Sequence, residues 1–302
     1  MNKIINKEQF SEKVYCFEVE APLIAKSCKP GNFIIVRVDS KSERVPYTIA
    51  KSDTDKGTLT LVIQEVGLSS TKFCRLNPGD FVHDIVGPLG NPSRIENYGT
   101  VICAGGGIGI AAILPILTAL KKAGNRVISV LAGRTKNLVI MVDDVKKYSD
   151  EVVIMTDDGS ITVGVEEVIK REHVDKVIAI GPPVMMKFTS FMAKKYGIPN
   201  DVSLNTIMVD GTGMCGACRL TIGGKTKFVC IDGPEFDGDL VDWDEMMKRM
   251  GTFKNVERED MEHFDGSIKK AQPNAQPQSS SIGNVSKATS DDTESMEEFT
   301  NR

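Results

Sequence analysis

Three cysteines and one aspartate have types and spacing that could hold a metal centre. Asp210, Cys215, Cys218 and Cys230 follow the order D-x4-C-x2-C-x11-C, among glycines that let the backbone fold around a compact object. A [2Fe–2S] cluster takes four ligands, and C-x4-C-x2-C with a more distant cysteine is one ligand spacing that it uses. Asp210 stands at the position of the first cysteine in that spacing. The four residues are therefore predicted to bind a [2Fe–2S] cluster.

Two other interpretations of this motif remain open. Zinc also accepts three thiolates and a carboxylate in a tetrahedral site. Alternatively, Asp210 is a turn-forming residue before Gly211, and water or Asp232 completes the cluster. A carboxylate is a harder ligand than a thiolate, so ligation by Asp210 would change the reduction potential of the cluster, in a direction that the sequence does not give.

A glycine-rich turn upstream of the cysteines has the pattern of a phosphate-binding loop. The apolar run Val101–Ala104 leads into Gly105-Gly-Gly-Ile-Gly109, and an apolar helical stretch follows to about Leu120. Glycine permits close approach of the backbone, and a helix N-terminus favours the charge of a pyrophosphate, although a tight strand–helix turn alone also needs glycine. The residues predicted to bind the nucleotide are Gly105, Gly106, Gly107 and Gly109, with Gly181 and Pro182 after the later strand 177–180.

Asp157-Asp158-Gly159 follows another predicted strand. A carboxylate near the adenosine end of a nucleotide would disfavour the extra phosphate of NADP. Asp157 is therefore a candidate cofactor-binding residue and indicates NAD(H), while a plain turn is the alternative.

The elements that must position these residues fall into distinct segments. Short β-rich runs at 14–20, 33–38 and 58–63, separated by Pro-Gly turns, predict an antiparallel β-barrel in residues 1–97. Apolar runs at 127–131, 152–155 and 177–180 alternate with helical stretches, which predicts a parallel α/β domain in 98–200. The cysteine module is expected in 201–266, with a hairpin in 220–230. The polar residues 267–302 are predicted to be a disordered tail.

Composition excludes several classes of function. The chain of 302 residues has 41% hydrophobic and 26% charged residues and a net charge of −4, which argues against a nucleic-acid surface. It has no apolar run long enough for a transmembrane helix and no apolar signal core, so we expect a cytoplasmic protein. The three histidines form no catalytic pattern, and an electron-relay role is therefore favoured over acid–base chemistry.

The order of barrel, glycine-loop domain and cysteine module resembles the ferredoxin–NADP reductase superfamily over residues 1 to about 265. An R-x-Y-[ST] element binds flavin in that superfamily. The resemblance implies that Arg44 contacts the pyrophosphate of FAD, that Tyr47 lies against the flavin ring and that Thr48, the candidate catalytic residue, lies near the flavin N5. Arg44 stands one residue further upstream of the tyrosine than in the family pattern. The cofactor-binding residues so implied are Arg44, Pro46, Tyr47, Thr48, Gly67, Ser70 and Thr71.

Without the resemblance, Arg44 to Thr48 would be an edge strand, and Thr48 a β-branched strand residue. Within the superfamily the chain resembles two kinds of subunit. One is the electron-transfer subunit of dihydroorotate dehydrogenase B, whose cluster uses four cysteines. The other is the small subunit of NADH-dependent reduced ferredoxin:NADP oxidoreductase, also described as the sulfide dehydrogenase small subunit, which uses one Asp and three Cys. The residues from Asp210 to Cys230 favour the second.

This resemblance implies an oxidoreductase subunit that passes electrons between NAD(H), FAD and a [2Fe–2S] cluster. It further implies a heterodimer with a larger flavin and iron–sulfur subunit, which handles ferredoxin and NADP by electron bifurcation. No membrane or nucleic-acid partner is expected. The alternatives are a relay subunit of a dihydroorotate dehydrogenase or a hydrogenase and, in a different class, a nucleotide-binding regulator stapled by zinc.

Overall fold

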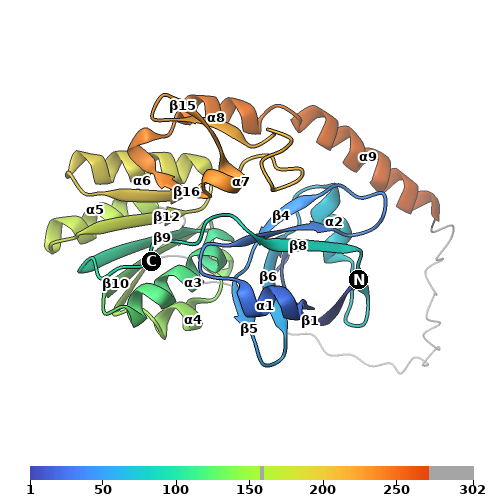
Figure 1. Ribbon diagram of the computed structural model, residues 1–302, viewed down its shortest axis with the longest axis horizontal. Coiled ribbons are helices and arrows are strands. Elements are labelled where there is room, and N and C mark those ends of the chain that lie inside the picture. Colours follow the sequence, from blue (N-terminus) through green and yellow to red (C-terminus); the bar gives the residue numbers. More distant parts are fainter. Residues whose placement is uncertain (157–159, 272–302) are drawn as a thin grey trace, which may run out of the picture. The chain divides into compact units, whose positions relative to one another are not determined.

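The N-terminal part of the chain is built from two antiparallel sheets. In the computed structural model, which describes residues 1–156 and 160–271, one sheet has the order β5-β6-β2-β1-β7 and the other the order β4-β3-β8 (Figure 1). The strands are β1 (Asn2–Ser11), β2 (Val14–Glu20), β3 (Phe33–Arg37), β4 (Val45–Thr48), β5 (Lys51–Asp53), β6 (Thr58–Gln64), β7 (Phe81–Val82) and β8 (Asp84–Leu89), with helices α1 (Pro22–Ser27) and α2 (Leu68–Cys74). The antiparallel architecture expected for this region is confirmed.

A single apolar core joins the two N-terminal sheets. Phe17 and Phe73 are fully buried in it and meet edge to face, with ring centroids 4.9 Å apart. Ile34 comes from the three-stranded sheet and Leu61 from the five-stranded one. Burial of each such side chain contributes about 2 kcal/mol. This core holds β4, and with it the predicted flavin segment, in a fixed position.

The central part of the chain is a mostly parallel sheet with the order β11-β10-β9-β12-β13-β16. Only β16 runs antiparallel to its neighbour. The strands are β9 (Thr100–Gly106), β10 (Arg126–Gly133), β11 (Glu151–Thr156), β12 (Lys176–Ile180), β13 (Asn200–Ser203) and β16 (Glu235–Asp237). The helices are α3 (Gly109–Lys122), η1 (Lys136–Leu138), α4 (Val142–Lys146), α5 (Ile161–Arg171) and α6 (Pro183–Lys195).

Helices cover both faces of this sheet, as the apolar runs predicted (Figure 1). Along β9, Val101 and Cys103 pack with α3, whereas Ile102 and Ala104 pack with α5 and α6. The glycine turn that follows β9 therefore opens at the carboxyl end of a central strand, where ligands of open α/β sheets bind.

The cysteine segment contains β14 (Arg219–Ile222), β15 (Lys225–Phe228), α7 (Val229–Asp232), η2 (Gly238–Leu240) and α8 (Trp243–Met250), followed by α9 (Lys254–Ala271). The expected hairpin is present, and Gly223 and Gly224 form its turn with φ of 58° and 73°. Positive φ at both turn positions is what a two-residue hairpin requires.

Two expected boundaries differ from the structure. The parallel sheet does not end at residue 200, because β13 runs to Ser203 and pairs with β16 from the cysteine segment. With one fully apolar residue in four, β13 carries no buried-strand pattern. Residues 267–271, expected in a disordered tail, belong to α9, while 272–302 lie outside the described residues.

Glu235 lies where the three modules meet. Ser93, between the N-terminal sheets and β9, donates a hydrogen bond to its carboxylate, and Ser203 of β13 is its strand partner. Asp201 and Lys176, which form an ion pair of 2.5 Å, also face it. Burial raises the pKa of Glu235 to about 7, although the bond from Ser93 opposes this.

Replacing Glu235 with Gln should remove one pH-dependent contribution to stability. The carboxyl binds its proton more tightly in the folded protein than in the unfolded chain, so the free energy of unfolding falls as pH rises from about 4.5 to about 7. The shift corresponds to on the order of 3 kcal/mol. Urea unfolding of both proteins at pH 4.5 and pH 8 measures this effect. Parallel pH profiles for the native protein and Glu235→Gln would contradict the assignment.

Candidate functional site

A cleft of about 290 Å³ brings the predicted flavin segment and the predicted nucleotide loop together. The predicted residues that line it are Pro46, Tyr47 and Thr48 on β4, Gly106, Gly107 and Gly109 after β9, and Gly181 and Pro182 after β12. These segments are far apart in the sequence and come from two modules. Of the predicted glycines in the loop, Gly105 is buried beneath the cleft, against α3.

Packing and backbone conformation require glycine in this loop. A Cβ atom on Gly109 would lie 2.2 Å from the carbonyl oxygen of Ile180 and 2.9 Å from Cα of Gly181. Gly107 has a φ of 57° and open space around its Cβ position. The backbone at Gly109 therefore packs directly against the end of β12, with no room for a side chain. The helix α3 begins at Gly109, in the cleft, and its N-terminus is available to an anion.

Two buried hydroxyl groups in the flavin segments have no hydrogen-bond partner among the described residues. They are Tyr47 OH and Thr71 Oγ1. Burial raises the pKa of Tyr47, whose ring packs on Phe73 at a centroid distance of 5.7 Å. An unsatisfied buried polar group costs about 1–3 kcal/mol, so both positions fit a bound molecule that supplies hydrogen-bonding partners.

The predicted flavin residues that lie outside the cleft lining are Arg44, Gly67, Ser70 and Thr71. Arg44 is exposed, and its charge helps Arg37 to lower the pKa of Asp84. Ser70 Oγ accepts hydrogen bonds of 3.0 Å from the N–H groups of Val66 and Gly67, and so caps α2. Gly67 has open space at its Cβ position.

A larger cavity of about 1030 Å³ shares Gly106, Gly107 and Pro182 with the cleft and lies at the carboxyl end of β10. Its polar and aromatic residues were not predicted from the sequence; they are Gln64, Arg134, Ser160, Thr162 and Phe188. Arg134 directly follows a buried strand, which is a signal that the sequence contained. Phe188 is 53% exposed, so its ring is available for stacking. Asp157 lies outside the described residues.

The predicted cluster ligands lie on one loop and one short helix. Cys218 and Cys230 are buried, with their sulfur atoms 3.2 Å apart, whereas Cys215 is exposed. The Asp210 carboxylate accepts the N–H groups of Thr212 at 2.8 Å and Cys215 at 2.7 Å, which lowers its pKa. Across residues 1–156 and 160–264, no group of three or more His, Cys, Asp or Glu side chains is already arranged to hold a metal ion.

The donor set nevertheless fits an iron–sulfur centre. Positive φ at Gly211, Gly213 and Gly216 curls the loop around the thiols. Burial, together with the adjacent Cys218, raises the pKa of Cys230, so a nearby positive charge favours its thiolate form. Iron supplies that charge, and thiolate is its usual ligand in such clusters.

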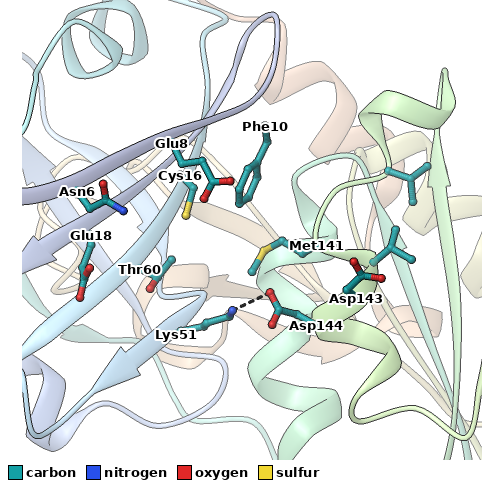
Figure 2. A pocket seen from close by; sticks show the side chains of 12 residues that line it. Asn6, Glu8, Phe10, Cys16, Glu18, Lys51, Thr60, Met141, Asp143 and Asp144 are labelled. Atoms are coloured by element: carbon teal, nitrogen blue, oxygen red, sulfur yellow. Dashed lines mark hydrogen bonds and ion pairs between the residues drawn. The ribbon is translucent and has the colours of Figure 1, made fainter.

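A further cavity of about 560 Å³ shares no lining residue with the two described above (Figure 2). Lys51 of β5 forms an ion pair of 2.8 Å with Asp144 of α4 across it. Burial is the main cause that raises the pKa of the Cys16 thiol to about 11, and the negative charge of Glu8 adds to it. This thiol therefore stays protonated and unreactive. The cavity therefore marks a contact between modules, and none of the predicted site residues lies in it.

Comparison with known proteins identifies the class. Residues 2–93 match the oxidoreductase FAD-binding domain, and residues 205–242 match the iron-sulfur cluster binding domain of dihydroorotate dehydrogenase B. A solved structure, described under flavin-based electron bifurcation by NADH-dependent reduced ferredoxin-NADP oxidoreductase, has a TM-score of 0.84 and 43% identity, over 87% of this chain and 98% of that one. The fold and site define an electron-transfer oxidoreductase subunit of the flavin and iron–sulfur type.

The family follows from the curated relatives. A dihydroorotate dehydrogenase B electron transfer subunit homolog of Thermotoga maritima is 45% identical, over 87% of this chain and 95% of the relative. The electron transfer subunit of Desulforamulus reducens is 32% identical, over 80% and 97%. The chain belongs to the family of dihydroorotate dehydrogenase B electron-transfer subunits and their homologues. Among the described helices, none has the length and apolar character needed to span a bilayer.

Proposed function

We propose that this subunit relays electrons between NAD(H) and a larger flavoprotein through FAD and a [2Fe–2S] cluster. The observation that carries the proposal is the cleft that Thr48 and Gly107 share, because it brings the flavin segment and the nucleotide loop to one site. Bound FAD supplies the exchange between two-electron hydride chemistry and one-electron transfer. The protein supplies proximity and orientation.

The residues of the cleft would have different roles in binding the flavin and the nucleotide. Tyr47 OH, which lines the cleft, would satisfy its hydrogen-bonding capacity on FAD, and the Thr48 side chain, which also lines the cleft, would orient the reacting edge of the flavin ring. Gly107 and the N-terminus of α3 would hold the pyrophosphate of the nucleotide. Gly181 and Pro182 would position the nicotinamide against the flavin.

The nucleotide is proposed to be NAD(H). The Thermotoga maritima homolog has NAD(+) in its name, and the matched solved structure is of an NADH-dependent enzyme. Arg134 offers a cation in the adjoining cavity that would suit either a pyrophosphate or the extra phosphate of NADPH. Stopped-flow reduction of the bound flavin by NADH and by NADPH separates the two. Faster reduction by NADPH at equal concentration would overturn the assignment.

The cluster is proposed to be of the [2Fe–2S] type, with Asp210, Cys215, Cys218 and Cys230 as ligands. The three thiols and the carboxylate lie on one glycine-rich loop and the helix α7 that follows the hairpin. The alternative carboxylate, Asp232, already accepts the N–H of Phe228 at 2.7 Å and pairs with Lys227. The Asp210 carboxylate likewise accepts the N–H groups of Thr212 and Cys215, so the position of Asp210 at the start of the D-x4-C-x2-C spacing is what favours it as the fourth ligand.

Replacing Asp210 with Cys is expected to shift the midpoint potential of the cluster, because a thiolate is a softer and more covalent donor than a carboxylate. We expect at least a tenfold change in the reduction equilibrium, about 59 mV for a one-electron couple. A redox titration followed by electron paramagnetic resonance measures it. Asp232→Asn is the matched control and should leave the midpoint unchanged. The opposite pattern would identify Asp232 as the ligand.

The partner is proposed to be a larger flavin and iron–sulfur subunit that handles ferredoxin and NADP. Exposed apolar side chains flank the proposed ligands on this surface: Val209 beside Asp210, Met214 beside Cys215 and Ile231 beside Cys230. Met214 is 89% exposed. An apolar rim around a redox centre suits a protein interface. Purification of the native complex, with analysis of its flavin and iron, tests the identity of the partner. We expect a second, larger subunit that contains its own flavin and iron. A complex active with dihydroorotate would favour the alternative partner.

A further inference from the structure

Two arginines bind consecutive carbonyl groups in the turn between Cys215 and Cys218. Arg219 Nη1 donates a hydrogen bond of 3.1 Å to the carbonyl of Gly216. Arg249 Nη2, from α8, donates one of 2.8 Å to the carbonyl of Ala217. Arg219 is exposed, whereas Arg249 is half-buried and reaches the turn from an element 32 residues away. The contact from Arg249 is therefore the stronger constraint.

These two contacts determine where the amide groups of the turn point. The C=O and N–H of one peptide unit are directed to opposite sides of the chain. When the carbonyls of residues 216 and 217 face the guanidinium groups, the N–H groups of Ala217 and Cys218 face the other side, where the thiols lie. The observed contact of 3.5 Å from Ala217 N to Cys215 Sγ agrees with this geometry.

The charge on both arginines adds to this effect. Across residues 1–156 and 160–264, neither Arg219 nor Arg249 has a carboxylate within ion-pair distance. The carboxylate of Glu245, one turn before Arg249 on α8, instead accepts the N–H of Thr221 at 2.8 Å. Cluster reduction adds one electron and hence one negative charge, which nearby cations and N–H groups stabilise.

We propose that Arg249, together with Arg219, is a positioning residue that raises the reduction potential of the cluster by holding the Cys215–Cys218 turn with its amide groups directed at the sulfur atoms. This inference rests on the proposed cluster ligation by that turn. The step that these arginines would affect is the transfer of one electron to or from the bound cluster, in which no bond is formed or broken. Arg249 therefore acts on the driving force of this step and does not itself react.

The test is the midpoint potential of the cluster in the full-length protein, measured by redox titration with paramagnetic resonance. Arg249→Met should lower the midpoint by the equivalent of at least a tenfold change in the reduction equilibrium, about 59 mV. Arg249→Lys keeps the positive charge, so its midpoint potential should lie closer to that of the native protein than to that of Arg249→Met. Lys248→Met is the matched control, because it removes one positive charge from the adjacent, exposed position of α8. It should leave the midpoint unchanged.

Two results would overturn the proposal. One is an unchanged midpoint in Arg249→Met at full iron content, and the other is an equal shift in Lys248→Met, which would assign the effect to net charge alone. If Arg249→Met is isolated without iron, Arg249→Gln provides the test in its place, because it also lacks the positive charge. The proposal then requires a lower midpoint potential in Arg249→Gln than in the native protein. A native protein that shows no cluster signal contradicts the proposed function, whereas a signal insensitive to Arg249 contradicts only this inference.

Discussion

Replacing Cys230 with Ser is expected to abolish assembly of the cluster while leaving reduction of the flavin by NADH intact. Cys230 is buried on α7 with its sulfur atom 3.2 Å from that of Cys218. A serine oxygen at this position is a weaker iron ligand than a thiolate. The cleft residues belong to β4 and to the turns after β9 and β12, so the flavin reaction does not depend on this sulfur.

The measurement combines iron analysis, visible absorption and single-turnover flavin reduction. In Cys230→Ser, iron content and electron delivery to the partner subunit should fall to background, and the rate of flavin reduction should stay within about twofold of native. Cys28→Ser is the control, because Cys28 is a half-buried free thiol at the end of α1, outside the motif. Normal iron content in Cys230→Ser would remove Cys230 from the ligand set.

Replacing Gly109 with Ala is expected to disable the nucleotide site. The added Cβ would lie 2.2 Å from the Ile180 carbonyl oxygen, so either α3 or the end of β12 must shift. Both elements line the cleft, and a displacement of about 1 Å at a reacting centre can cost on the order of 100-fold in rate. Overpacking of this kind also costs about 1–3 kcal/mol of stability.

Stopped-flow reduction by NADH should therefore slow about 100-fold in Gly109→Ala. Reduction by dithionite, which needs no nucleotide site, should proceed as in the native protein. Gly251→Ala is a suitable control, because a Cβ there would lie 3.4 Å or more from its neighbours and the backbone φ is −84°. Native-like NADH kinetics in Gly109→Ala would show that the nucleotide binds elsewhere.

Local patterns predicted the elements and part of the site. The apolar run after Thr100 and the following glycines predicted β9, the turn and α3, because a buried parallel strand and a phosphate-type loop each impose a recognisable composition. The sequence also placed Tyr47 and Thr48 on a strand of the N-terminal module, and both line the cleft. These features depend on residues that are close together in the chain, so a local sequence pattern is enough to predict them.

Features that depend on distant partners could not be predicted in this way. The pairing of β13 with β16 joins residues more than 30 positions apart, and neither strand carries an apolar alternation. The contact of Arg249 with the cluster loop is equally remote in sequence, because α8 must first pack beside the hairpin. From the sequence alone, Phe188 would be expected in the core beneath α6. Only the structure shows that its ring is exposed in the cavity.

Electrons from NADH are expected to reach an iron–sulfur cluster held by Asp210 and three cysteines of this chain. Anaerobic titration of the purified subunit with NADH, followed by absorption and by low-temperature electron paramagnetic resonance, tests it most directly. We expect two iron atoms per chain, bleaching of the flavin and the appearance of a reduced [2Fe–2S] signal. A preparation that contains zinc, or that gives no such signal even after reduction with dithionite, would contradict it.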